Sequence, residues 1–224
     1  MNSGRERILG RLRAPKSSQQ LPQTCDEELF ANYSASLSRP VEAFAAKLAG
    51  LKGEFHQVTD IDSAASKLKS ILAEVFEHGA KSGNFAIRQK HGLLEQICNK
   101  DSWLQSVVKV ATGEIENSRL GEFEVGITTA DFLIARTGSI LVSAASSGGR
   151  RLSVLPPFHI VIATQDQIVS SLDEAFDKYR RDGKLGASSY AAIITGPSRT
   201  ADIEKILVLG AHGPKRLAVI LMAS

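Results

Sequence analysis

The chain has 224 residues, of which 43% are hydrophobic and 23% are charged, and its formal net charge is +3. This length suits one α/β domain with a full core and a small extension, and the small, dispersed charge argues against a nucleic-acid surface. No apolar run approaches the ~18–20 residues of a membrane span, and the basic first residues lack the apolar core of a signal peptide, so a cytoplasmic protein is expected.

The first 37 residues read as a helical extension. Residues 3–13 have the pattern of a short basic amphipathic helix, residues 15–23 form a polar linker bracketed by prolines, and residues 26–37 can form a second helix. The first helix could dock on its own domain or on a sister subunit, or it could serve as a tail for a partner protein. We therefore expect an N-terminal helical extension over 1–37 and an α/β domain over 38–224.

The next part of the chain alternates between helices and strands. Pro40 suits the first turn of a helix, and Asp60 or Asp62 can cap a long helix that runs to about Glu77 and ends at Gly79. In order, we expect helix 41–51, strand 54–58, the helix ending at 77, strand 84–88, helix 91–98 and strand 106–111. Helices of this length between strands imply crossovers and a mainly parallel sheet.

From residue 123 the apolar runs become shorter and leave room only for turns between them. We expect strands at 132–135, 139–142, 152–155 and 159–163, pairing antiparallel or as a hairpin beside the parallel part. These are followed by helix 165–181, strand 190–195, helix 201–207 and strand 217–222. The fold class is therefore α/β: a single domain with a mainly parallel mixed sheet flanked by helices.

The first candidate site is the segment from Thr195 to Thr200, between an expected strand and an expected helix. Backbone N–H groups at the helix start, the Ser198 and Thr200 hydroxyls and the Arg199 guanidinium could together hold a carboxylate or a phosphate. Alternatively, a hydroxyl only caps the helix while Arg199 pairs with a nearby acidic residue.

A second candidate is the glycine-containing loop that runs from Ser146 to Arg150 and Arg151. Small residues would let backbone amides approach an anion, although the loop could equally be a hairpin tip with solvated charges. The two prolines that follow fix the backbone that enters the His159 strand. His159 is then either a positioned functional group or a structural, hydrogen-bonded histidine.

Asp131 is the candidate base, or the group that orients a histidine such as His159 or His212; it could instead only cap a turn. His212 lies between glycine-containing neighbours and is accessible for acid–base chemistry. Thr137 and Ser139 form the turn after the strand that follows Asp131, and we include both in the candidate anion-binding set.

No metal or cluster site is expected in this chain. Cys25 and Cys98 form neither a disulfide framework nor a pair of metal-ligand spacing, and iron–sulfur clusters ordinarily need four cysteine ligands. His56, His78 and His91 are interpreted as surface residues, and none of the five histidines shows a metal-binding spacing.

Three segments resemble the LUD-domain lactate-utilisation family, the LutC/YkgG group: GITTADFLIARTGSILV, RLSVLPPFHIVI and TGPSRTADIEKILVLGAHGPK. The family usually has Ala-Glu-Thr-Gly where this chain has Ala-Arg136-Thr-Gly, so no role of that acidic residue is carried over. The resemblance implies a fold like that of the NagB/RpiA/CoA-transferase group, which by itself says nothing about chemistry.

The same resemblance implies an accessory subunit of a bacterial system that oxidises L-lactate to pyruvate, in which iron–sulfur partner proteins supply the redox centres. We expect it to bind a small anionic ligand at the C-terminal strand ends, and a homo-oligomer is compatible with this role. Two alternatives stay open. One is a stand-alone enzyme acting on a small acid, phosphosugar or CoA ester, although Arg136 occupies the tempting position for a glutamate nucleophile. The other is a non-catalytic assembly protein.

Overall fold

The chain divides into two compact units, residues 1–33 and 34–224. A computed structural model describes residues 36–77, 85–111, 119–147, 151–184, 188–201, 207–209 and 213–223, all within the second unit. For residues 145, 147, 199–201 and 207–209 the description covers the backbone alone. The predicted helix over 3–13, residues 26–35 of the predicted helix over 26–37, and Gly79 lie outside the described residues, and residues 36 and 37 are not helical.

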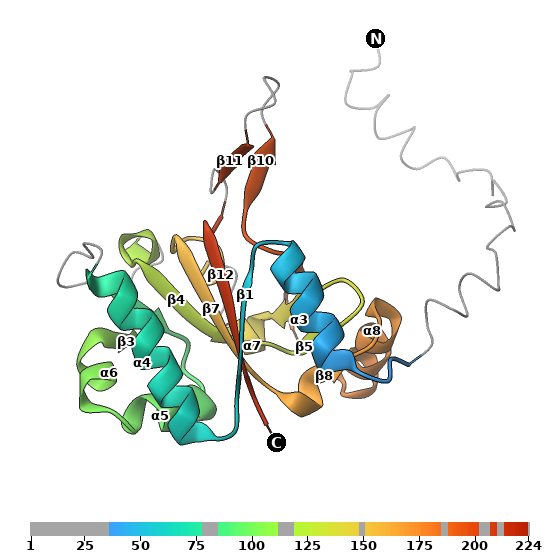
Figure 1. The fold of residues 1–224 in the computed structure, drawn as a ribbon, viewed down its shortest axis with the longest axis horizontal. Coiled ribbons are helices and arrows are strands. Elements are labelled where there is room, and N and C mark those ends of the chain that lie inside the picture. The colour runs from blue at the N-terminus through green and yellow to red at the C-terminus, as the bar shows by residue number, and fades with distance from the viewer. Residues whose placement is uncertain are drawn as a thin grey trace, which may run out of the picture. The chain divides into compact units, whose positions relative to one another are not determined.

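A six-stranded parallel sheet forms the centre of the second unit (Figure 1). Its strands are β1 (Glu54–Val58), β2 (Ala86–Arg88), β3 (Val108–Val110), β4 (Val125–Thr129), β7 (Phe158–Thr164) and β12 (Arg216–Met222). They lie in the order β1-β12-β7-β4-β2-β3, and every neighbouring pair is parallel. The expected α/β fold with a mainly parallel sheet is confirmed.

Three helices cover one face of this sheet: α4 (Ile61–Glu77), α5 (Gly92–Asn99) and α6 (Ser102–Val107). Two of them begin at aspartates that act as caps. The Asp60 carboxylate accepts from the Ser63 N–H at 2.8 Å, and that of Asp101 accepts from the Trp103 N–H at 2.9 Å. Apolar residues of the three helices and of the inward side of the strands form one continuous core.

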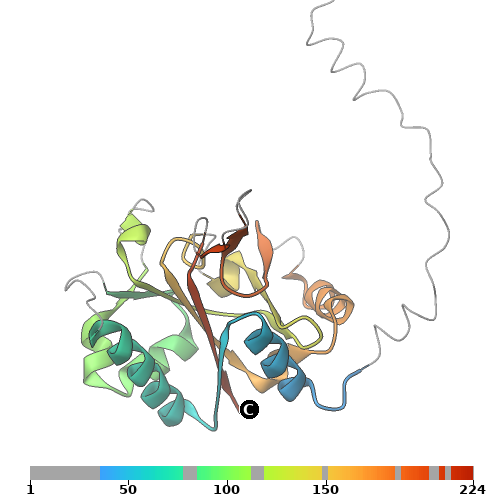
Figure 2. The same cartoon turned by 45° about the horizontal axis from the view of Figure 1, so that its top comes forward.

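A second, four-stranded sheet packs with helix α3 (Pro40–Gly50) on the opposite face (Figure 2). Its strands are β5 (Phe132–Ile134), β6 (Ser139–Ser143), β8 (Ile168–Val169) and β9 (Ala191–Ile194), in the order β8-β5-β6-β9. The predicted hairpin is present, since β5 and β6 pair antiparallel. The hairpin does not extend the parallel sheet, however, but lies over its face.

Alternation along β5 explains the layering. Leu133 faces the core shared with α3, whereas Phe132 and Ile134 face helix α8 (Leu172–Arg181). The N–H of Glu174, in the first turn of α8, donates to the Ser171 hydroxyl at 3.2 Å, which caps this helix. The described layers are therefore α4–α6, the parallel sheet, the mixed sheet with α3, and α8.

The turn between β5 and β6 requires glycine. Gly138 has φ +66°, and a Cβ atom there would lie 2.7 Å from the backbone nitrogen of Leu48 in α3. This close contact fixes the hairpin against the helix.

Several sequence predictions were wrong. The run 152–155 forms turns, because the prolines that follow end any pairing there. The predicted helix over 165–181 is a 3-10 turn (Gln165–Gln167), then β8, then α8. Strand β4 and helix α6 had not been predicted. The strand expected over 159–163, which was expected to pair antiparallel beside the parallel part, is β7, and it pairs parallel with β4 and β12 in the centre of the sheet.

The predicted helix over 201–207 was also wrong at both of its ends. Ala201 belongs to strand β10 (Arg199–Ala201) and Leu207 to strand β11 (Leu207–Leu209), and the two strands pair antiparallel. Residues 202–206 lie outside the described residues. No helix therefore begins at Ser198–Thr200, and the argument from free N–H groups at a helix start does not apply there.

Candidate functional site

A cleft of about 380 Å³ opens at the carboxyl edge of the parallel sheet, where β4 and β7 end. It is lined by His91, Leu93, Thr129, Ala130, Asp131, Ser146, Thr164, Gln167 and Lys184. In open α/β sheets ligands bind in crevices outside the carboxyl ends of strands. This cleft is therefore the candidate functional site.

Asp131 lies at the centre of the polar groups in the cleft. The Ser146 hydroxyl donates to its Oδ2 at 2.6 Å, and the Lys184 ammonium donates to its Oδ1 at 3.3 Å. The Asp131 side chain is 5% exposed, whereas that of Lys184 is 41% exposed. The result is a carboxylate held in place from one side and a lysine that still reaches the opening.

Ser146 is fixed by the chain around it. It lies in the short helix α7 (Ala144–Ser147), directly after β6, and its hydroxyl accepts from the Ser143 N–H at 2.8 Å. Its carbonyl accepts from the Thr129 hydroxyl at 2.9 Å, and the Thr129 N–H donates to the buried Gln89 side chain at 3.0 Å. These bonds join Gln89, which directly follows β2, with β4 and α7 around Asp131 and hold its geometry before any ligand binds.

His91 contributes a hydrogen-bond donor. Its Nδ1 accepts from the Leu93 N–H at 3.3 Å and so caps helix α5. Partial burial lowers the pKa of His91 from its ordinary 6.5, which favours the neutral ring. Because Nδ1 is the acceptor, the proton of the neutral ring lies on Nε2, which can donate.

Gln167 forms the opposite wall. Its amide nitrogen donates to the Ala130 carbonyl at 2.6 Å, and its amide oxygen accepts from the Thr164 N–H at 2.7 Å. The backbone that leads into Asp131 is thereby tied to the end of β7.

Taken together, the cleft offers one carboxylate, one ammonium group and one neutral imidazole donor. Such a site suits a small polar ligand with a single negative charge better than a polyphosphate, because Asp131 neutralises Lys184. Within the described residues, no group of three or more His, Cys, Asp or Glu side chains could hold a metal ion.

The predicted partnership between Asp131 and His159 is not formed. His159 lies near the amino end of β7, 1% exposed, and its Nε2 lies 2.8 Å from the Thr128 hydroxyl. Among the described residues its buried Nδ1 has no hydrogen-bond partner, and burial lowers the pKa of His159 to about 3. It is a neutral histidine at the end of the sheet away from the cleft.

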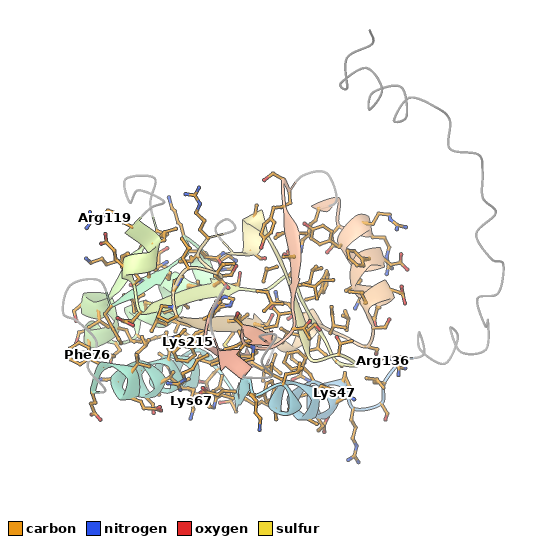
Figure 3. The ribbon with its side chains drawn as sticks, turned by 90° about the horizontal axis from the view of Figure 1, so that it is seen from above. Lys47, Lys67, Phe76, Arg119, Arg136 and Lys215 are labelled. Atoms are coloured by element: carbon orange, nitrogen blue, oxygen red, sulfur yellow. The ribbon has the colours of Figure 1, made fainter. Side chains whose placement is uncertain are left out.

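Two of the predicted anion-binding residues, Ser139 and Thr195, lie close together, but outside the cleft. The Ser139 and Thr195 hydroxyls lie 2.9 Å apart, at the end of β6 opposite to Ser143 and Ser146. The turn that contains Arg136 and Thr137 packs against α3 through Gly138, and Figure 3 shows Arg136 and Lys47 toward the same side of the molecule. None of these residues lines the cleft.

The remaining predicted residues lie outside the cleft or outside the described part of the chain. The Ser198 N–H donates to the Pro214 carbonyl at 2.8 Å, and Arg151 is exposed. Arg150 and His212 lie outside the described residues, and Arg199 and Thr200 are described only as backbone of β10. Whether these groups bind an anion stays a prediction.

Sequence reasoning missed Lys184 and His91. Lys184 is 53 residues from Asp131 in the chain, so no local pattern joins them. His91 is exposed, as predicted, but its role as the cap of α5 beside the cleft was not predicted, although its position directly before an apolar helical run is a capping signal.

Comparison with known proteins adds the family. The family model described as LUD domain matches residues 41–222. Lactate utilization protein C of Bacillus subtilis is 35% identical over 113 residues, which cover 50% of this chain and 47% of that protein. The uncharacterized protein YkgG of Escherichia coli is 30% identical over 131 residues, which cover 58% of this chain and 54% of that protein. The chain thus spans about half the length of these relatives.

A solved structure supports the fold. The crystal structure of a DUF162 family protein from Deinococcus radiodurans has a TM-score of 0.59 and 21% identity, and it covers 83% of this chain and 99% of that one. In addition, none of the helices in the described segments has the length and apolar character of a transmembrane span.

Proposed function

Because the chain belongs to the LUD-domain family, we propose that it is an accessory subunit of a bacterial L-lactate utilisation system, which oxidises L-lactate to pyruvate. The proposal is supported by the relatives that are named lactate utilization protein C, from Bacillus subtilis and other bacteria. The role in lactate utilisation is proposed from the sequence similarity to these relatives, because a shared fold alone does not imply a shared function.

The ligand in this proposal is a small anionic acid bound in the cleft at the carboxyl ends of β4 and β7. One observation carries it: Lys184, Ser146 and the buried Asp131 meet there within hydrogen-bond distance. Lys184 and the Nε2–H of His91 supply donors for a carboxylate.

In this proposal the two electrons removed from L-lactate pass to a partner protein. Oxidation of a hydroxy acid to a keto acid removes two electrons and two protons, so an acceptor must be close to the site. The sequence has two cysteines, fewer than the four that iron–sulfur clusters ordinarily use. Iron–sulfur partner proteins are therefore the proposed acceptors, and the cleft would face them.

Thermal unfolding of the purified protein tests the ligand. L-lactate, pyruvate, phosphate, a sugar phosphate and a CoA ester are each added, to the wild type and to two lysine variants. At a hundredfold excess over its dissociation constant, a ligand adds about 2.7 kcal/mol of stability, which raises Tm by roughly 5–10 °C in a chain of this size.

The variants locate the site. Lys184→Met should abolish the shift, whereas Lys178→Met should retain it, because Lys178 pairs with Glu174 on α8 and does not line the cleft. A shift that survives in Lys184→Met would place the ligand elsewhere. A shift with the CoA ester alone would favour a stand-alone enzyme, and no shift with any compound would favour the assembly role.

The partner is tested separately. The tagged chain is co-expressed with iron–sulfur proteins of a lactate-utilisation system, and iron is measured in the purified complex. Co-purification of iron-containing partners is the expected result, and purification of the chain alone would contradict the accessory-subunit role.

A further inference from the structure

We infer that the cleft selects a 2-hydroxy acid over the corresponding 2-keto acid, because the group that meets the C2 oxygen, Asp131, can accept hydrogen bonds but cannot donate them. The inference rests on the proposed function, since it takes a small acid as the ligand. Beyond the proposed function, it states which redox form of that acid binds more tightly, and it names Asp131 as the residue that determines this preference.

The surroundings of Asp131 keep it an acceptor. Both of its described side-chain partners are donors: the Ser146 hydroxyl on Oδ2 at 2.6 Å and the Lys184 ammonium on Oδ1 at 3.3 Å. The Ser146 oxygen also accepts from the Ser143 N–H at 2.8 Å, and its hydroxyl proton is directed at Asp131. A carboxylate whose two oxygens both accept from donors has only lone pairs to offer to a ligand.

Asp131 also has acceptor capacity left for a ligand. A carboxylate provides about four lone-pair positions, and the described bonds to Ser146 and Lys184 use one on each oxygen. The side chain is 5% exposed and lines the cleft, so an additional donor must come from inside the cleft.

The other donors orient the ligand. Lys184 has three N–H groups, so it can contact Asp131 and a ligand carboxylate together. His91 caps α5 through Nδ1 and therefore presents Nε2–H as a second donor at the same cleft. With its carboxylate on these donors, a 2-hydroxy acid places its C2 oxygen toward Asp131.

The two redox forms then differ at one contact. The hydroxyl of L-lactate donates to Asp131, whereas the ketone oxygen of pyruvate would set two acceptors against each other in a buried site. An unpaired buried polar group costs enough to lower affinity by about tenfold or more. The cleft should therefore hold the substrate and release the product.

Calorimetric titration of the full chain measures this preference with L-lactate, pyruvate and propionate, which lacks the C2 oxygen. We expect L-lactate to bind at least about tenfold more tightly than pyruvate, and pyruvate no more tightly than propionate. In Asp131→Asn the amide can donate, so the lactate-to-pyruvate ratio should fall to about one or reverse. Asp166→Asn, at an exposed acidic residue outside the cleft, should keep the wild-type ratio.

The outcomes separate this inference from the proposed function. If L-lactate and pyruvate bind with equal affinity, and Lys184→Met abolishes the binding of both, the preference is overturned but the proposed acid site is supported. Binding of neither acid would contradict both. If Asp131→Asn fails to fold, the affinities of the wild-type protein for the three acids still test the inference. Tighter binding of pyruvate than of L-lactate would overturn it.

Discussion

The buried His159 should make the stability of the protein depend on pH between pH 7 and 5, above the ordinary pKa values of carboxylates. Its ring is 1% exposed, and burial lowers its pKa from 6.5 to about 3. His159 therefore binds a proton near pH 6.5 in the unfolded chain but only near pH 3 in the folded chain. The contribution of His159 to stability is complete above pH 6.5 and is lost as the pH falls toward 3.

The size of the effect follows from the two pKa values. Each pH unit between them is worth about 1.4 kcal/mol, which gives a loss of about 2 kcal/mol between pH 7 and pH 5. The lowered pKa values of His56 and His91 act in the same direction, so the test must isolate His159. His159→Gln does so, because its amide can still donate to Thr128 and does not titrate.

Urea unfolding at pH 7, 6 and 5 and constant ionic strength is the assay. Between pH 7 and pH 5 the wild type should lose about 2 kcal/mol more than His159→Gln. The same pH dependence in both proteins would refute the reasoning. If the variant does not fold, proton NMR of the wild type replaces it, and a His159 ring that titrates between pH 7 and 5 would contradict the account.

Two further predictions concern local structure, and Tm measurements check both. Gly138→Ala should destabilise by more than about 1 kcal/mol, because φ is positive and the new methyl group meets the α3 backbone, whereas Gly50→Ala has open space and should not. Equal Tm values would contradict this. Ser171→Ala should cost about 1 kcal/mol by removing the cap of α8, and Ser70→Ala, on the exposed side of α4, is its control.

Much of the fold could be predicted because local signals agreed with tertiary structure. Pro40 begins α3, Asp60 caps α4, and the apolar run at β12 lies inside a parallel sheet. Strand β4 was missed although four of its five residues are β-branched, because Gly126 interrupts the run; pairing with β2 and β7 completes the strand. Ile168 and Val169 were taken as helical because their pairing with β5 is not visible in local periodicity.

The candidate site could be predicted only in part, for a similar reason. Asp131 and the Ser146 segment are polar groups at strand ends, and the sequence singled out both. The ammonium group that joins them comes from Lys184, after α8, and only the packing of that helix on the second sheet brings it there. His159 has the same local features as a functional histidine, and only its burial at the other end of the sheet separates the two readings.

The most direct test of the central claim is a crystal structure of the protein soaked with L-lactate. The account predicts the acid in the cleft at the carboxyl ends of β4 and β7, with its carboxylate on Lys184 and its hydroxyl on Asp131. Lactate bound at the Ser198 turn or elsewhere, with this cleft empty at a saturating concentration, would contradict it.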